Sequence, residues 1–210
     1  ELVKEVSASS VGATFVARTP SGENVILTKI HRHVAKSPQL CDAFLNEAKK
    51  AATLAHPNVA RVVESGTLDG EPFVTHEHQD GETLAAVLRR AGPDGLPLGV
   101  AARIVLDIIA AIEAAHQAPV ALGHGELGPW CVHLGSDGRA RVSGFAVDRA
   151  LTRFGLHFAK NLDRLPYAAP ERVKAMSLTL GPAPAAPDLK ADTFSAVLIA
   201  WELFTRQRLF

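Results

Sequence analysis

The stretch HGELGPWCVHLGSDGRARVSGFA, residues 124–146, decides the fold, because it joins a polar loop to a regular β-hairpin. Val132 and Leu134 are spaced to face Ala140 and Val142 across a Ser-Asp-Gly turn. The loop in front of the hairpin starts with a histidine and looks suited to chemistry, but glycine and cysteine occupy much of it. The stretch therefore predicts a two-stranded antiparallel hairpin beside a candidate site.

Short apolar segments separated by turn signals precede this hairpin, and longer helical patterns surround it. The expected strands lie at residues 13–18, 25–30, 59–63 and 72–75. The expected helices lie at residues 39–54, 82–90, 98–117 and 192–205, with Ser37-Pro38 as the start signal of the first. The pattern predicts an α+β fold: a small antiparallel-sheet lobe with one helix (residues 1–80) and a mainly helical lobe (residues 81–210).

The composition narrows the classes of partner. Lys plus Arg and Asp plus Glu both number 22, so no global charge attracts nucleic acid or an acidic membrane. Cys41 and Cys131 lack metal or disulfide spacing, which favours a cytoplasmic protein. The longest apolar run, residues 100–115, is broken by charges, so no membrane span is expected. The chain starts at Glu1 without methionine and is expected to be a fragment, whose full-length protein could carry an anchor elsewhere.

Further motifs occur in the order and spacing of a protein kinase. They are VILTKI with Lys29, FLNEAKK with Glu47, HPNV at 56–59, EHQDGETL at 77–84, HGEL at 124–127, GFA at 144–146, APE at 169–171 and DTFSAV at 192–197. The sequence resembles, along its whole length, bacterial serine/threonine protein kinases of the eukaryotic type. The resemblance implies a bilobal kinase-like fold that ends after the large central helix of the second lobe.

The resemblance also implies catalytic positions, and the residues at these positions have changed. Glu126 stands at the catalytic aspartate, Cys131 at the asparagine that holds one magnesium ion, and Gly144 at the aspartate that holds the main one. Gly128 replaces the lysine that steadies the γ-phosphate. Phosphoryl transfer depends on positioning and charge neutralisation, and magnesium requires oxygen ligands, so no catalytic residues and no metal are expected.

The nucleotide pocket implied by the resemblance has changed as well. Serines stand where backbone amides would approach phosphates, a leucine lies above the adenine position, and a histidine lies below it. Lys29 and Glu47 would form either the phosphate-binding pair of the family or a simple strut between helix and sheet, and the strut is favoured. The nucleotide-pocket positions are Ser7, Ser9, Gly12, Leu27, Lys29, Glu47, His76, His78 and His133.

Several other residues allow a functional and a purely structural interpretation. The pairs His31/His33 and His76/His78 supply only two metal ligands each, so a metal site is disfavoured. His124 and Phe145 are expected to pack in the core. Cys131 is expected to be a buried small residue rather than a nucleophile.

The regulatory positions have changed too. Gly125 replaces the arginine that would receive a phosphate on Thr152. The Pro-rich segment at 181–187 is interpreted first as a solvated insertion and second as a segment that docks a partner. Arg164 is predicted to form an ion pair with Glu126 that blocks the site.

The favoured interpretation is a pseudokinase that serves as a scaffold or allosteric module for another, unidentified protein. It needs no cofactor, because independent catalytic groups are missing together. One alternative is an atypical, low-activity serine/threonine kinase that uses ATP and Glu126 as the base. Another is weak ATP binding without magnesium and without turnover. Whether the chain is an enzyme stays open at this point.

Overall fold

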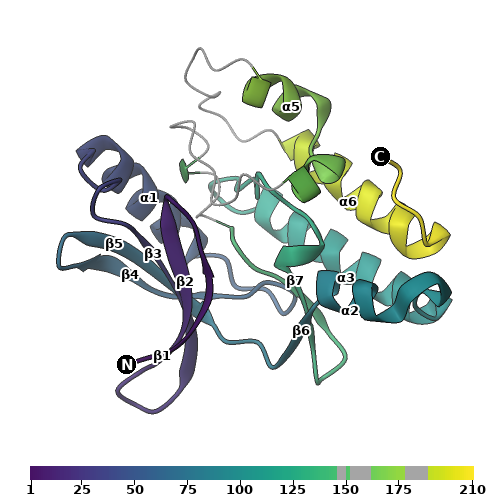
Figure 1. Cartoon of the computed structure of the whole chain (residues 1–210), viewed down its shortest axis with the longest axis horizontal. Helices are drawn as coiled ribbons and strands as arrows, with labels where there is room; N and C mark the ends of the chain where they lie inside the picture. Colours follow the sequence, from purple (N-terminus) through teal and green to yellow (C-terminus); the bar gives the residue numbers. More distant parts are fainter. Residues whose placement is uncertain (146–149, 152–161, 178–188) are drawn as a thin grey trace.

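Two antiparallel sheets and a group of helices build the chain (Figure 1). The computed structural model describes residues 1–145, 150–151, 162–177 and 189–210. The first sheet has the order β1-β2-β3-β5-β4 and the second has the order β6-β7-β8. The strands are β1 (Leu2–Ala8), β2 (Gly12–Arg18), β3 (Asn24–Ile30), β4 (Val62–Leu68), β5 (Glu71–Glu77), β6 (Gly81–Thr83), β7 (Val132–Gly135) and β8 (Ala140–Val142). The helices are α1 (Pro38–Ala51), α2 (Leu84–Ala91), α3 (Leu98–His116), α5 (Pro170–Ser177) and α6 (Leu189–Thr205), and the short 3₁₀ turns are η1 (Gly92–Asp94), η2 (Pro129–Cys131) and η3 (Leu162–Tyr167).

The first sheet and α1 form the β-rich lobe, which confirms the α+β architecture predicted from the sequence. The side chain of Ser37 caps α1, since its hydroxyl accepts a hydrogen bond from the amide of Leu40 at 3.3 Å. The helix then buries one face that includes Phe44 and Ala48. β2 pairs with β3 in antiparallel fashion, as the predicted hairpin requires, and the pairing brings Gly12 opposite Ile30.

Three parts of the sequence prediction for the strands and helices were wrong. Instead of a strand over residues 59–63, Val59 bridges Val142 of β8, and β4 begins only at Val62. The helix predicted from residue 82 begins at Leu84, because residues 81–83 pair with β7. β1 was not predicted, since it is exposed along its whole length and shows no buried alternation.

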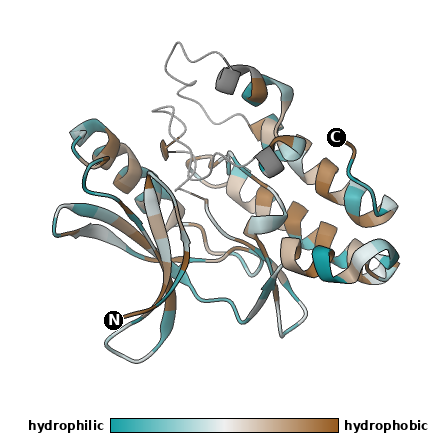
Figure 2. Ribbon diagram, viewed as in Figure 1, coloured by the Kyte–Doolittle hydropathy of each residue, from teal (hydrophilic) through white to brown (hydrophobic). Residues whose placement is uncertain are grey.

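The helical lobe is built around α3 and α6, which pack against each other and carry broad hydrophobic stretches (Figure 2). The α3 residues Ala101, Ile104 and Ile108 are buried, and so is Ile199 of α6. In the described residues, none of the helices has the length and apolarity that crossing a membrane requires. Thr152 and the Pro-rich segment at 181–187 lie outside the described residues.

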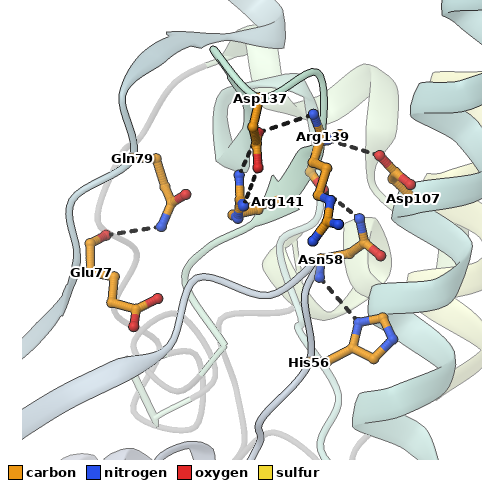
Figure 3. A network of polar contacts seen from close by, with 9 residues as sticks. His56, Asn58, Glu77, Gln79, Asp107, Asp137, Arg139 and Arg141 are labelled. Atoms are coloured by element: carbon orange, nitrogen blue, oxygen red, sulfur yellow. Dashed lines mark hydrogen bonds and ion pairs between the residues drawn. The ribbon is translucent and has the colours of Figure 1, made fainter.

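The predicted hairpin is confirmed as β7 and β8, with Val132 opposite Val142 and Leu134 opposite Ala140. Two buried side chains fix its position, as Figure 3 shows. Asp107 of α3 accepts a hydrogen bond from the amide of Ala140 at 2.9 Å. The side-chain amide of Asn58 donates to the carbonyl of Ala140 at 2.9 Å. The hairpin is therefore attached both to α3 and to the segment between α1 and β4.

We expect Asp107→Ala to lower the free energy of unfolding by about 2 kcal/mol, because the buried amide of Ala140 would lose its acceptor. Arg103→Ala removes only the ion pair between Arg103, whose side chain is 57% exposed, and Asp107. This control should cost less than about 1 kcal/mol. Urea denaturation of both variants tests the difference, and equal losses would contradict the proposed role of the backbone hydrogen bond.

Candidate functional site

The loop in front of the hairpin is held by one buried carboxylate. Asp192 of α6, 1% exposed, accepts hydrogen bonds from the amides of His124 and Gly125 at 2.7 and 2.9 Å. It also accepts one from the ring of His116 at 3.1 Å. Burial alone would raise the pKa of Asp192, but these donors hold it below the ordinary value, so the carboxylate stays ionised.

His124 is a packing residue, as the sequence predicted. Its ring is fully buried and meets Phe145 edge to face at 5.0 Å. Nε2 donates to the carbonyl of Ser143 at 2.8 Å, and Nδ1 accepts from the amide of Glu126 at 3.2 Å. Burial lowers the pKa of His124, so the neutral ring joins the catalytic-type loop to the segment that follows β8.

The predicted ion pair between Arg164 and Glu126 is present. A terminal nitrogen of Arg164 lies 2.9 Å from Glu126 Oε2, and Arg172 lies 3.9 Å from Oε1. The Glu126 side chain is only 8% exposed. The carboxylate lines a small cavity of about 40 Å³ together with Tyr167 and Ser195. The one acid at a catalytic position is therefore neutralised by arginine from the segment that follows it.

Trp130 occupies the space beside this ion pair and was missed by the sequence analysis. Its ring lies under the guanidinium of Arg164 at 4.8 Å and meets Tyr167 edge to face at 5.5 Å. A Cβ atom at Gly128 would come within 2.2 Å of Trp130 Cη2. The indole thus fills the volume into which a side chain at position 128 would extend. The sequence signal that could have indicated this contact is the spacing of Gly128 and Trp130, which are separated by one proline.

Two other changed positions have backbone conformations that favour glycine. Gly125 has φ of +91° and Gly144 has φ of +95°. Cys131 is buried and forms a local ring with Gly128, donating to its carbonyl at 3.0 Å and accepting from its amide at 3.3 Å. The side chain at position 131 therefore closes the loop on itself.

The turn between β1 and β2 stands where the family's phosphate-binding loop would lie. The Ser9 hydroxyl accepts hydrogen bonds from the amides of Val11 and Gly12 at 3.2 and 3.3 Å. Backbone amides of this kind would otherwise be available to phosphates. The same turn is held by two histidines. Nε2 of His31 donates to the carbonyl of Ser9 at 3.1 Å, and Nε2 of His33 donates to the carbonyl of Ser10 at 2.9 Å. Ser7 lies in exposed β1 and takes no part in this arrangement.

The expected contact between Lys29 and Glu47 was wrong, both as a phosphate-binding pair and as a strut. Lys29 Nζ pairs with Glu71 Oε2 at 2.7 Å, and Glu47 pairs with Lys50 one helical turn away at 2.8 Å. Glu71 begins β5 beside the end of β3, so it reaches Lys29 within the sheet. This ion pair lowers the pKa of Glu71 and keeps it charged.

Three of the predicted pocket histidines lie close together between the lobes. His76 of β5 is buried. Burial is the larger cause that lowers the pKa of His76, to about 4, and it also lowers the pKa of His133. The charge of His133, on β7, lowers the pKa of His76 as well, and the charge of His78 lowers the pKa of His133. His133 donates to Ser143 Oγ at 3.0 Å. Leu27 faces Thr75 across β3 and β5.

His31 and His33 lie in the turn after β3, with stacked rings 5.7 Å apart. Within the described residues, no group of three or more His, Cys, Asp or Glu side chains has a geometry that could hold a metal ion.

Comparison with known proteins places this arrangement among protein kinases. No protein-family profile matches the chain. The tyrosine-protein kinase MasK of Myxococcus xanthus is 26% identical over 100% of this chain and 33% of its own length. The serine/threonine-protein kinase PknE of Mycobacterium bovis is 28% identical over 95% of this chain and 33% of its own length. The chain thus spans about a third of the curated relatives it matches.

A solved structure shares the fold over the whole chain. The PknI kinase domain of Mycobacterium tuberculosis superposes with a TM-score of 0.73 at 23% identity, covering 100% of this chain and 73% of that domain. A second structure of that domain, from a double mutant, superposes with a TM-score of 0.72 at 25% identity, over 97% of this chain and 74% of that domain. The described residues therefore have a protein-kinase-like fold.

We expect Gly128→Ala to lower the free energy of unfolding by about 1 to 3 kcal/mol, because the new Cβ meets Trp130. The backbone itself is extended at Gly128, with φ of −169°, and accepts any residue. In a Trp130→Ala background the same substitution should therefore cost almost nothing. A double-mutant cycle measured by urea denaturation tests this coupling, and additive losses would contradict it.

We expect stability to fall between pH 6.5 and about 4 because of His76, whose pKa drops from 6.5 to about 4 on folding. The unfolded chain binds a proton in this range and the folded chain does not, so acid favours unfolding. His76→Leu should reduce that loss by on the order of 3 kcal/mol. Thr75→Val, a buried neighbour without a titrating group, should leave the pH slope unchanged. Identical slopes in wild type and His76→Leu would contradict the assignment.

Proposed function

Because the chain belongs to the family of bacterial serine/threonine protein kinases of the eukaryotic type, we propose that it is a pseudokinase that binds another protein without transferring phosphate. The observation that carries this proposal is the occupied catalytic position. Glu126 is held by Arg164 at 2.9 Å and by Arg172 at 3.9 Å, and its side chain is buried. A carboxylate that two arginines neutralise in this way is a weaker base toward an acceptor hydroxyl.

The surrounding positions support the same proposal. Phosphoryl transfer requires magnesium and positive charge around the transferred group. Gly144 carries no ligand atom, Cys131 offers sulfur where magnesium prefers oxygen, and Trp130 fills the space above Gly128. Lys29, the expected phosphate contact, is paired with Glu71.

The packing residues support a binding role in place of catalysis. His124 and Phe145 keep their contact, and Asp192 keeps the loop attached to α6. These interactions hold the loop, the segment after β8 and α6 together, and a scaffold or allosteric module needs such a fixed fold without providing chemistry. The Arg164–Glu126 pair adds a charged contact that joins the loop to the segment before α5.

The alternative enzyme needs a rearrangement of this site. Glu126 lines a cavity, and its carboxylate could serve as a base if Arg164 moved away. An unexpected magnesium ligand would then have to be supplied. ATP bound weakly without magnesium is the third possibility, and it involves no turnover.

We expect no phosphate transfer from radiolabelled ATP to a serine/threonine peptide library by the wild type, Glu126→Gln or Arg164→Thr, because the charges needed in the transition state are absent. A ligand that binds only the folded state must raise Tm. Because we expect no binding of ATP with magnesium, we expect no rise of Tm when both are added.

Each other outcome assigns the chain differently. Transfer that Arg164→Thr increases and Glu126→Gln abolishes would overturn the pseudokinase and establish the atypical kinase. A rise of Tm with ATP that does not need magnesium, without transfer, would establish nucleotide as a structural ligand. Arg89→Ala, a change at an exposed position of α2, serves as the control for nonspecific effects of removing an arginine.

A further inference from the structure

A shallow hollow lies on the surface where β3 leads into α1. Its lining residues are His31, Arg32, His33, Lys36 and Glu71. Four of these belong to the single segment HRHVAK, residues 31–36, which we call the basic segment. We propose that this hollow binds a phosphoserine or phosphothreonine side chain of a partner protein. The inference rests on the proposed protein-binding function and names the chemistry of the partner.

The charges in the hollow leave a local positive surplus. Glu71 is the one acid that lines it, and Lys29 pairs with its carboxylate at 2.7 Å. The amide of Arg32 donates to the same carboxylate at 3.3 Å. With the charge of Glu71 balanced by Lys29, the charges of Arg32 and Lys36 are left over. Two cations beside one hollow match the dianion of a phosphate monoester.

Both cations have donors to spare. Arg32 is exposed and gives one terminal nitrogen to the carbonyl of Asp69 at 2.6 Å, which leaves most of the five N–H donors of a guanidinium for a ligand. Lys36 is exposed, and no ion pair joins it to another of the described residues. α1 begins at Pro38 with no acidic side chain in its first turn, so nothing there opposes an anion.

The two imidazoles are oriented in advance. Each Nε2 must carry a hydrogen, because the partners at Ser9 and Ser10 are carbonyl oxygens, which only accept. His31 and His33 therefore line the hollow and hold the β1–β2 turn at the same time. Binding at the hollow would in this way fix the turn that replaces the phosphate-binding loop.

A phosphorylated peptide fits this surface better than nucleic acid does. Nucleic-acid sites need a basic stripe along several phosphates, whereas this surplus comes from one short segment on a chain with 22 basic and 22 acidic residues. A carboxylate carries half the charge of a phosphate monoester and fewer acceptor oxygens. A single phosphorylated side chain is thus the ligand that uses both cations.

The test measures fluorescence anisotropy of a fluorescein-labelled Gly/Ala peptide that contains one phosphothreonine. Arg32→Ala/Lys36→Ala should weaken binding at least about tenfold, because charge-assisted hydrogen bonds are lost. The control Lys49→Ala/Arg89→Ala removes two exposed cations elsewhere and should change binding less than about twofold. Tm is measured for every variant to show that each one folds.

Other results would overturn the proposal. They are no binding by the wild type, equal binding of the peptide with unmodified threonine or with glutamate, and equal weakening in the control variant. Displacement of the peptide by a single-stranded oligonucleotide or by phosphatidylserine vesicles at lower concentration than by unlabelled phosphopeptide would assign the hollow to that other class. Peptide binding and phosphate transfer are measured in separate assays. Binding together with transfer would indicate an active kinase that has this site, and neither binding nor transfer would indicate a pseudokinase that lacks it.

Discussion

The arrangement of the candidate site depends on the buried carboxylate of Asp192. It accepts hydrogen bonds from the amides of His124 and Gly125 and from the ring of His116. One side chain of α6 thus joins α3, the loop and α6. A buried charge is tolerated only when donors surround it, and three donors do so here. The loop is therefore fixed by an interaction that does not involve any catalytic group, so the residues at the catalytic positions could change without loss of the fold.

In the proposed pseudokinase, neighbouring side chains fill the space and balance the charge at the positions that the resemblance implies as catalytic. Trp130 takes the space beside Gly128, and Arg164, which stacks on the Trp130 ring, brings a positive charge to Glu126. A buried carboxylate without a cation would be costly, so Arg164 stabilises Glu126 in its buried position. A side chain at position 128 would thus meet Trp130, on which Arg164 stacks. Gly128, Trp130, Arg164 and Glu126 form one coupled set.

The sequence predicted the parts that follow from local patterns. Alternation and a Ser-Asp-Gly turn set the register of Val132 against Val142, and Ser37 marked the start of α1. The Arg164–Glu126 pair was predicted because the motif spacing placed both residues in the site. The partner of Lys29 could not be predicted, since the choice between Glu47 and Glu71 depends on the distance between α1 and the sheet.

The first sheet shows where positive charge is located in this chain. Lys29 lies on β3, but its ammonium group is neutralised by Glu71, and the amides of Val11 and Gly12 are taken by Ser9. Donors for an anion are thus used up in the nucleotide region. They remain in the basic segment, residues 31–36, because the same Glu71 carboxylate cannot balance Lys29 and the additional cations together. The anion site that we propose consequently lies beside α1, and not at the position where the resemblance implies nucleotide.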